Sequence, residues 1–116
     1  MNVIDLLITT LTTAYKYPVF LQGTYTGDEY PDNFFTYLVN ESPDRQHYDD
    51  TVNSWTWDIT VIYYTKDPAL LSTMPKQSRE ALQAVGFIPQ GKGRNTFSDD
   101  PNFTGWATEF LFLDKN

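Results

Sequence analysis

One segment, residues 54–65, limits the fold more than any other part of the chain. Its first half alternates bulky apolar with polar side chains, as a strand does when one face is buried and the other meets solvent. Its last half is apolar on both sides, which is typical of a strand with both faces covered. The segment therefore predicts a long sheet strand. The apolar set is Trp55, Trp57, Ile59, Val61 and Tyr63, which alternates with Ser54, Thr56, Asp58, Thr60, Ile62 and Tyr64.

Residues 3–15 instead repeat apolar side chains at helical spacing. Such a stripe predicts an amphipathic helix with one buried face. Asn2 is a suitable N-cap, and Pro18 ends the element because the residue before a proline avoids helical geometry. The expected buried stripe is Val3, Ile4, Leu7, Leu11 and Ala14.

A second helical region follows the long strand. Asp67-Pro68 combines a favoured N-cap with a proline at the first helical position. A further proline soon afterwards predicts a short turn at 68–73 and then a main helix over 75–85, capped by Ser72 or Thr73. The expected buried stripe is Met74, Ser78, Ala81, Leu82 and Val85, with Gly86 and Phe87 forming a Schellman ending.

The order of elements predicts an α+β fold in a single domain over residues 1–116. We expect one mostly antiparallel sheet with about two helices packed on one face, a two-layer sandwich. The remaining strands are expected at 19–21, 34–39, 87–88 and 106–113, and long loops at about 22–33, 40–53 and 89–104.

Charge excludes several functions. The chain has 116 residues, with 15 acidic and 8 basic side chains and a net charge of −7. This balance argues against binding to a phosphate backbone or to an anionic membrane surface. No stretch approaches the roughly 18 apolar residues of a spanning helix, and the N-terminus does not resemble a secretion signal, so we expect a protein of the cytosol. Seven acids lie between residues 22 and 53 against the single base Arg45: Asp28, Glu29, Asp32, Glu41, Asp44, Asp49 and Asp50.

No residue pattern assembles a reactive centre. The absence of cysteine excludes disulfides, thiolate zinc sites and a cysteine nucleophile. His47 is the single histidine and has no second ligand at a metal-binding spacing, and the acidic clusters lack the register of a calcium loop. Residues 91–94 (Gly-Lys-Gly-Arg) lack the spacing of a phosphate-binding loop. We therefore predict no catalytic residue, no metal site and no cofactor.

Aromatic residues make up 16% of the chain and suggest a surface for assembly. A single sheet with two helices on one face leaves the other face partly open, and an open aromatic face favours self-association. Lys92 and Arg94 are expected to pair with an acidic loop of a neighbouring copy. The candidate interface residues are Phe34, Phe35, Tyr37, Trp55, Trp57, Lys92, Arg94 and Trp106.

From residue 2 to residue 113 the chain resembles the small tail-completion proteins of long-tailed bacteriophages, also called tail terminators or head–tail joining proteins. The features that carry the resemblance, besides the N-terminal helix, are Tyr30-Pro31-Asp32-Asn33-Phe34-Phe35-Thr36-Tyr37, Tyr48-Asp49-Asp50, Trp57-Asp58-Ile59-Thr60-Val61-Ile62-Tyr63-Tyr64-Thr65 with Asp67-Pro68, Ala84-Val85-Gly86-Phe87, Ser98-Asp99-Asp100 and Thr104-Gly105-Trp106.

This resemblance implies a structural protein of the virion, assembled in the host cytoplasm. Copies would form a ring, expected to be a hexamer, that caps the tail tube and joins it to the head. Its partners would be other copies, the major tail tube protein and head–tail connector proteins, and family members have no catalytic residues to carry over. DNA would pass through the ring without specific binding, which an acidic lumen would favour. The lumen candidates are Asp28, Glu29, Asp32, Asp44, Asp49 and Asp50.

Two other functions fit the composition. Clustered acids are also typical of an acidic protein-binding adaptor or inhibitor, for instance one that mimics the charge of DNA. A hydrolase built on His47 and neighbouring carboxylates would require a convergent pocket around that side chain.

Overall fold

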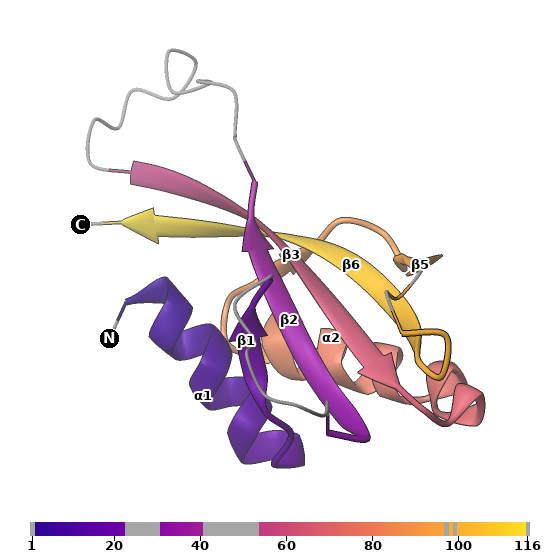
Figure 1. The fold of residues 1–116 in the computed structure, drawn as a ribbon. Coiled ribbons are helices and arrows are strands. Elements are labelled where there is room, and N and C mark those ends of the chain that lie inside the picture. Colours follow the sequence, from indigo (N-terminus) through magenta and orange to yellow (C-terminus); the bar gives the residue numbers. More distant parts are fainter. Residues whose placement is uncertain (1, 23–30, 41–53, 97, 99, 116) are drawn as a thin grey trace.

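A computed structural model describes residues 2–22, 31–40, 54–96, 98 and 100–115, although the side chains of residues 54, 55, 114 and 115 lie outside this description. These residues form two α-helices, a short 3-10 helix and six strands (Figure 1). In chain order they are α1 (Val3–Tyr15), β1 (Val19–Leu21), β2 (Asn33–Val39), β3 (Ser54–Thr65), the 3-10 helix η2 (Pro68–Ser72), α2 (Met74–Ala84), β4 (Ile88–Pro89), β5 (Arg94–Thr96) and β6 (Thr104–Lys115).

The strands of the described chain form one sheet in the order β1-β2-β3-β6-β4, and β5 also pairs with β6. Only β1 and β2 run parallel, and every other pairing is antiparallel. The central pair, β3 and β6, is in register from Ser54 opposite Lys115 to Thr65 opposite Thr104. The predicted α+β arrangement, a mostly antiparallel sheet with two helices, is confirmed.

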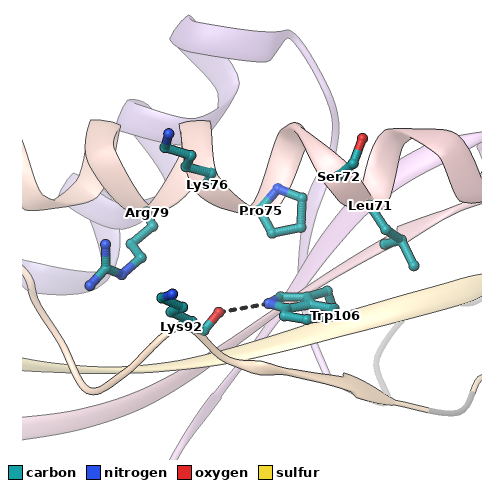
Figure 2. A pocket seen from close by; sticks show the side chains of 7 residues that line it. All are labelled: Leu71, Ser72, Pro75, Lys76, Arg79, Lys92 and Trp106. Atoms are coloured by element: carbon teal, nitrogen blue, oxygen red, sulfur yellow. Dashed lines mark hydrogen bonds between the residues drawn. The ribbon is translucent and has the colours of Figure 1, made fainter.

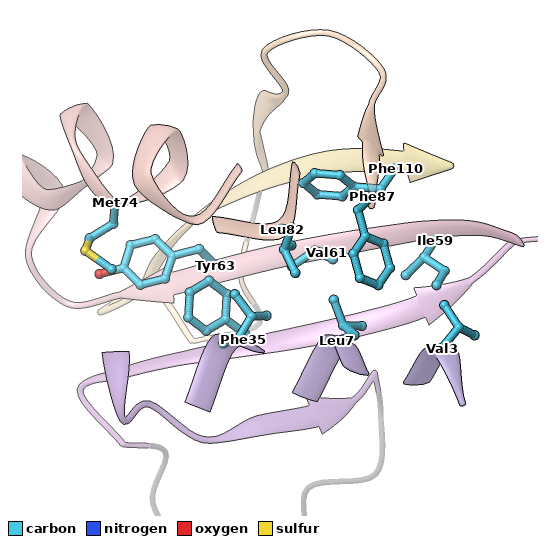
Figure 3. Close-up of a cluster of buried hydrophobic side chains, with 11 residues drawn as sticks. Val3, Leu7, Phe35, Ile59, Val61, Tyr63, Met74, Leu82, Phe87 and Phe110 are labelled. Atoms are coloured by element: carbon cyan, nitrogen blue, oxygen red, sulfur yellow. The ribbon is translucent and has the colours of Figure 1, made fainter. Parts of the chain in front are cut away.

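Both helices cover the same face of the sheet, and the main core lies between them and the sheet (Figure 3). The odd-numbered residues of β3 from Trp57 to Tyr63 point into this core, as the alternation predicts. They meet the helical stripe Val3, Leu7 and Leu11, whereas Ala14 is exposed. Burying each large aliphatic side chain contributes roughly 1.5–3 kcal/mol. The buried core residues are Val3, Leu7, Leu11, Phe35, Ile59, Val61, Tyr63, Met74, Leu82, Phe87 and Phe110.

The predicted helix ends are confirmed at three points. Asn2 Oδ1 accepts a hydrogen bond of 2.8 Å from the Asp5 amide and so caps α1. Asp67 Oδ1 accepts one of 3.0 Å from the Ala69 amide and caps η2. Gly86, at φ +110°, ends α2 in a Schellman motif, in which the Phe87 amide donates to the Leu82 carbonyl.

Other local predictions hold in part or are wrong. Thr73 occupies the N-cap of α2, one of the two positions predicted, but its side chain makes no capping hydrogen bond. Val85 is 39% exposed and does not join the buried stripe of α2. The predicted loop at 89–104 contains the strand β5, which sequence patterns miss because Arg94, Asn95 and Thr96 show no apolar alternation and form only a short edge pairing.

Candidate functional site

The sheet face opposite the helices, here called the open face, has two unlike halves. It carries the even-numbered residues of β3 from Thr56 to Tyr64 and their cross-strand neighbours. One half is covered by the chain's own aromatic side chains: Phe34 stacks on Tyr64 with ring centroids 5.1 Å apart and meets Phe103 edge-on at 5.5 Å. Phe20 and Ile62 pack against this aromatic cluster. The aromatic side chains of this half are therefore buried against one another within one subunit.

The other half presents aliphatic side chains to solvent. Leu111 and Leu113 follow each other on the same side of β6, and Ile88 of β4 lies opposite Leu111. Ile88 is 51% exposed and Leu113 is 42% exposed. We call Ile88, Leu111 and Leu113 the aliphatic patch. An exposed, contiguous group of this kind is typical of a contact surface, whereas single exposed aliphatics are common on any protein.

Polar residues separate the aliphatic patch from Leu38 on β2, which is 43% exposed. Asn40 Nδ2 donates hydrogen bonds to Asp58 Oδ1 at 3.2 Å and to Thr60 Oγ1 at 2.7 Å. Glu109 lies opposite Thr60 in the register of β3 and β6. The open face thus offers both apolar area and oriented polar groups to a partner.

A basic pocket lies on the opposite side of the sheet, where η2 and α2 meet the turn after β4 and the start of β6 (Figure 2). Its volume is about 430 Å³, within the range of small ligand-binding pockets. Lys76, Arg79 and Lys92 supply positive charge, and no acidic residue lines the pocket. Its remaining lining residues are Leu71, Ser72, Pro75 and Trp106.

Two hydrogen bonds hold the outer wall of the basic pocket. Trp106 Nε1 donates to the Lys92 carbonyl at 2.9 Å, and Arg79 Nε donates to the Gly91 carbonyl at 3.1 Å. Gly93 has φ +89°, and an added Cβ would lie 2.5 Å from both the Ala107 carbonyl oxygen and Trp106 Nε1. The turn that carries Lys92 is therefore tied to α2 and to β6 through its backbone.

Glu80, the acidic side chain of α2, affects the pKa of a tyrosine on α1. Burial, and then the charge of Glu80, raise the pKa of Tyr15 on α1. Glu80 also lies next to Arg79 and one helical turn after Lys76, both of which line the pocket. The ion pairs of the described residues do not involve the cations of the pocket. They join Lys66 to Asp32 at 3.3 Å and Arg94 to Glu109 at 3.9 Å.

The structure corrects part of the predicted interface. Phe34 is 3% exposed and Phe35 is 0% exposed, so neither is available to a partner. They point to opposite faces of β2, and each is covered within the subunit, Phe35 by the helices and Phe34 by the aromatic cluster. The prediction of an open aromatic face is therefore wrong for the described residues: its aromatics are mutually buried, and the exposed apolar groups are aliphatic.

The other predicted residues are dispersed. Tyr37 and Trp57 are half-buried against the main core, and Trp106 lines the basic pocket. Lys92 and Arg94 are exposed, and Asp32 is exposed beside Lys66. The side chain of Trp55 lies outside the described residues, as do His47 and the acids Asp28, Glu29, Asp44, Asp49 and Asp50.

Sequence reasoning missed the basic pocket and the aliphatic patch. Lys76 and Arg79, three residues apart on a predicted helix, could have indicated a basic face. Among the described residues, no group of three or more acidic or histidine side chains could hold a metal ion. Likewise, no helix in that part of the chain is both long and apolar enough to cross a membrane. Comparison of the sequence with models of known protein families and with curated proteins finds no match.

Proposed function

We propose that this chain is a non-enzymatic structural protein of a bacteriophage virion, whose copies form a ring that caps the tail tube and joins it to the head. The observation that carries the proposal is the aliphatic patch on a sheet face that no described helix covers. The resemblance of residues 2–113 to tail-completion proteins supports it independently. In this proposal the ring assembles in the host cytoplasm and becomes part of the virion tail.

Ring assembly requires two unlike surfaces on each subunit, because a head-to-tail contact repeats until it closes. This subunit offers the aliphatic patch on the open face, with Ile88 and Leu113 about half exposed, and the basic pocket on the opposite side of the sheet. The first would lose water on association, and the second would set the orientation. The major tail tube protein and the connector proteins are the proposed partners of the two ends of the ring.

The net charge of −7 is suited to a channel for DNA. A polyanion passing an acidic wall forms no lasting phosphate contacts. Asp32 is an exposed acid of the described chain, and it is partly neutralised by Lys66 at 3.3 Å. The proposal therefore assigns DNA transit without specific binding, rather than DNA recognition.

Negative-stain microscopy of tail tubes tests this function, with the tube protein encoded in the same genome as substrate. Tubes grown with the wild-type chain should carry a ring at one end, and native mass spectrometry should give one defined stoichiometry, expected to be six. The substitution Leu113→Gln places a polar group in the aliphatic patch and should reduce the fraction of capped ends. Val85→Gln is the matched control, because Val85 has a similar exposure, 39%, and lies at the end of α2.

Uncapped tubes that continue to grow in the presence of folded wild-type protein would contradict the proposal. Capping by Leu113→Gln at wild-type efficiency would remove the aliphatic patch from the interface. If the chain instead binds a basic protein in a strongly salt-dependent manner and leaves tubes unaffected, it is an acidic adaptor or inhibitor.

A further inference from the structure

We propose that the basic pocket between α2 and β6 receives a carboxylate-rich segment of a second copy of this chain. This proposal rests on the assembly function above and names the contact that would join neighbouring subunits. The pocket collects three of the eight basic residues of an otherwise acidic chain, and none of its lining residues is acidic (Figure 2).

The positive charges that line the pocket favour binding of an anion from outside the subunit. Lys76, Arg79 and Lys92 line the pocket, with the Lys76 ammonium directed away from Trp106 and Lys92 (Figure 2). The ion pairs of the described chain involve Lys66 and Arg94 instead. Glu80 follows Arg79 directly and lies one helical turn after Lys76 on α2, but it is not among the ion pairs of the described residues. Carboxylates placed beside Arg79 and Lys92 would gain charge-assisted hydrogen bonds, and Lys76 on the same helix adds to the positive potential.

The first turn of α2 adds to the positive field. Pro75 and Lys76 belong to this turn and also line the pocket. Thr73, at the N-cap, gives no side-chain hydrogen bond to the free amides of the turn. A helix N-terminus carries a partial positive charge, so an acid in the pocket would lie in the favourable field of α2.

The pocket is preformed, which lowers the entropic cost of binding. Its outer wall is fixed by the bonds from Trp106 to the Lys92 carbonyl and from Arg79 to the Gly91 carbonyl. Trp106, Leu71 and Pro75 give it an apolar floor. A volume of about 430 Å³ admits several side chains of a peptide, with acids at the cations and an apolar or tyrosine side chain on the floor.

The chain itself contains the complementary chemistry. The stretches 22–33 and 40–53 hold seven of the 15 acids, and each contains tyrosine. Two copies with a charge of −7 repel each other in most orientations, so a contact between an acidic stretch and the basic pocket would be selected electrostatically. Such a contact joins unlike surfaces, which is the geometry that closes rings. A nucleic acid is disfavoured as the occupant because the whole chain repels a long polyanion.

Peptide binding to the full-length chain tests the inference. Synthetic peptides of residues 22–33 and 40–53 are titrated at protein concentrations at which sedimentation shows a monomer, and binding is followed by fluorescence anisotropy of the labelled peptide. Neutral versions of the peptides replace Asp by Asn and Glu by Gln. Inorganic tripolyphosphate is titrated in parallel as a probe of phosphate binding.

Lys92→Glu and Lys16→Glu form a matched pair, because each changes the net charge equally and both side chains are exposed. Lys92 contributes its backbone carbonyl to the fold, so its side chain can be replaced without loss of the Trp106 bond. At least one acidic peptide should bind, and Lys92→Glu should weaken that binding on the order of tenfold. The neutral peptide should bind more weakly by a similar factor, and Lys16→Glu should have little effect.

Failure of both acidic peptides to bind would overturn the inference, as would equal weakening by the two lysine variants. Tripolyphosphate binding without peptide binding would overturn it in favour of a phosphate site. These outcomes are separate from the tube assay: tubes capped by a chain that binds neither peptide would retain the function and reject the pocket contact.

Discussion

Two glycines in the turn between β4 and β5 provide a controlled test of how the wall of the basic pocket is held. Gly91 and Gly93 both have positive φ, +93° and +89°. A Cβ at position 91 would meet nothing within 4 Å, whereas one at position 93 would lie 2.5 Å from the Ala107 carbonyl oxygen and from Trp106 Nε1. The two substitutions to alanine therefore share the backbone cost but differ in the steric cost.

Gly91→Ala should lower the free energy of unfolding by about 1–2 kcal/mol, the cost of placing an L-residue in a left-handed conformation. Gly93→Ala adds a clash with β6, so the turn must move. Movement would break the bonds from Trp106 to Lys92 and from Arg79 to Gly91, each contributing roughly 0.5–1.5 kcal/mol. The expected loss for Gly93→Ala is about 3–4 kcal/mol.

Urea denaturation followed by circular dichroism measures both values, and equal m-values would show that the two variants unfold from comparably compact states. Gly93→Ala should also weaken binding of the acidic peptide, since Lys92 would move, while Gly91→Ala should preserve it. If both variants lose the same stability within about 0.5 kcal/mol, the close approach of Gly93 to β6 does not hold the turn.

Three further changes test separate features. Asn2→Ala removes the cap of α1 and should cost about 1 kcal/mol in urea denaturation, whereas no change would show that the bond to Asp5 is unimportant. Thr36→Val should instead stabilise the chain by about 1 kcal/mol in the same assay, because Thr36 Oγ1 is buried without a hydrogen-bond partner among the described residues; a loss would reveal a partner. Burial raises the pKa of Tyr63 above 10, so the folded state holds this proton more tightly than the unfolded state. Its stabilising contribution should be complete below pH 10 and decline as the pH rises through the higher folded pKa. Tyr63→Phe should reduce this alkaline decline in thermal denaturation, and an unchanged pH profile would contradict the assignment.

The sequence predicted the elements that depend on local chemistry. The strand at 54–65, the cap at Asn2 and the glycine ending at Gly86 follow from side-chain period, capping and backbone freedom, and the structure has them at the expected residues. The strand β5 escaped prediction because it owes its conformation to pairing with β6 rather than to its own composition.

Which faces meet solvent could not be read from the sequence in the same way. Both faces of β2 are apolar, so its pattern allowed either two covered faces or a contact with another subunit. The structure shows that Phe34 and Phe35 are both covered within the subunit. The basic pocket was equally hidden, because Leu71 of η2 and Trp106 of β6 are far apart in the chain and line one pocket only in the folded structure. Assembly surfaces of this kind form from residues that are brought together by the tertiary fold, so a local sequence pattern does not predict them.

The most direct measurement is the length of tail tubes over time after the purified chain is added to growing tubes. A ring that caps the tube end predicts that elongation stops at a length fixed by the moment of addition, and that Val85→Gln stops it as the wild type does. Tubes that lengthen at the same rate with and without the folded chain would contradict the account.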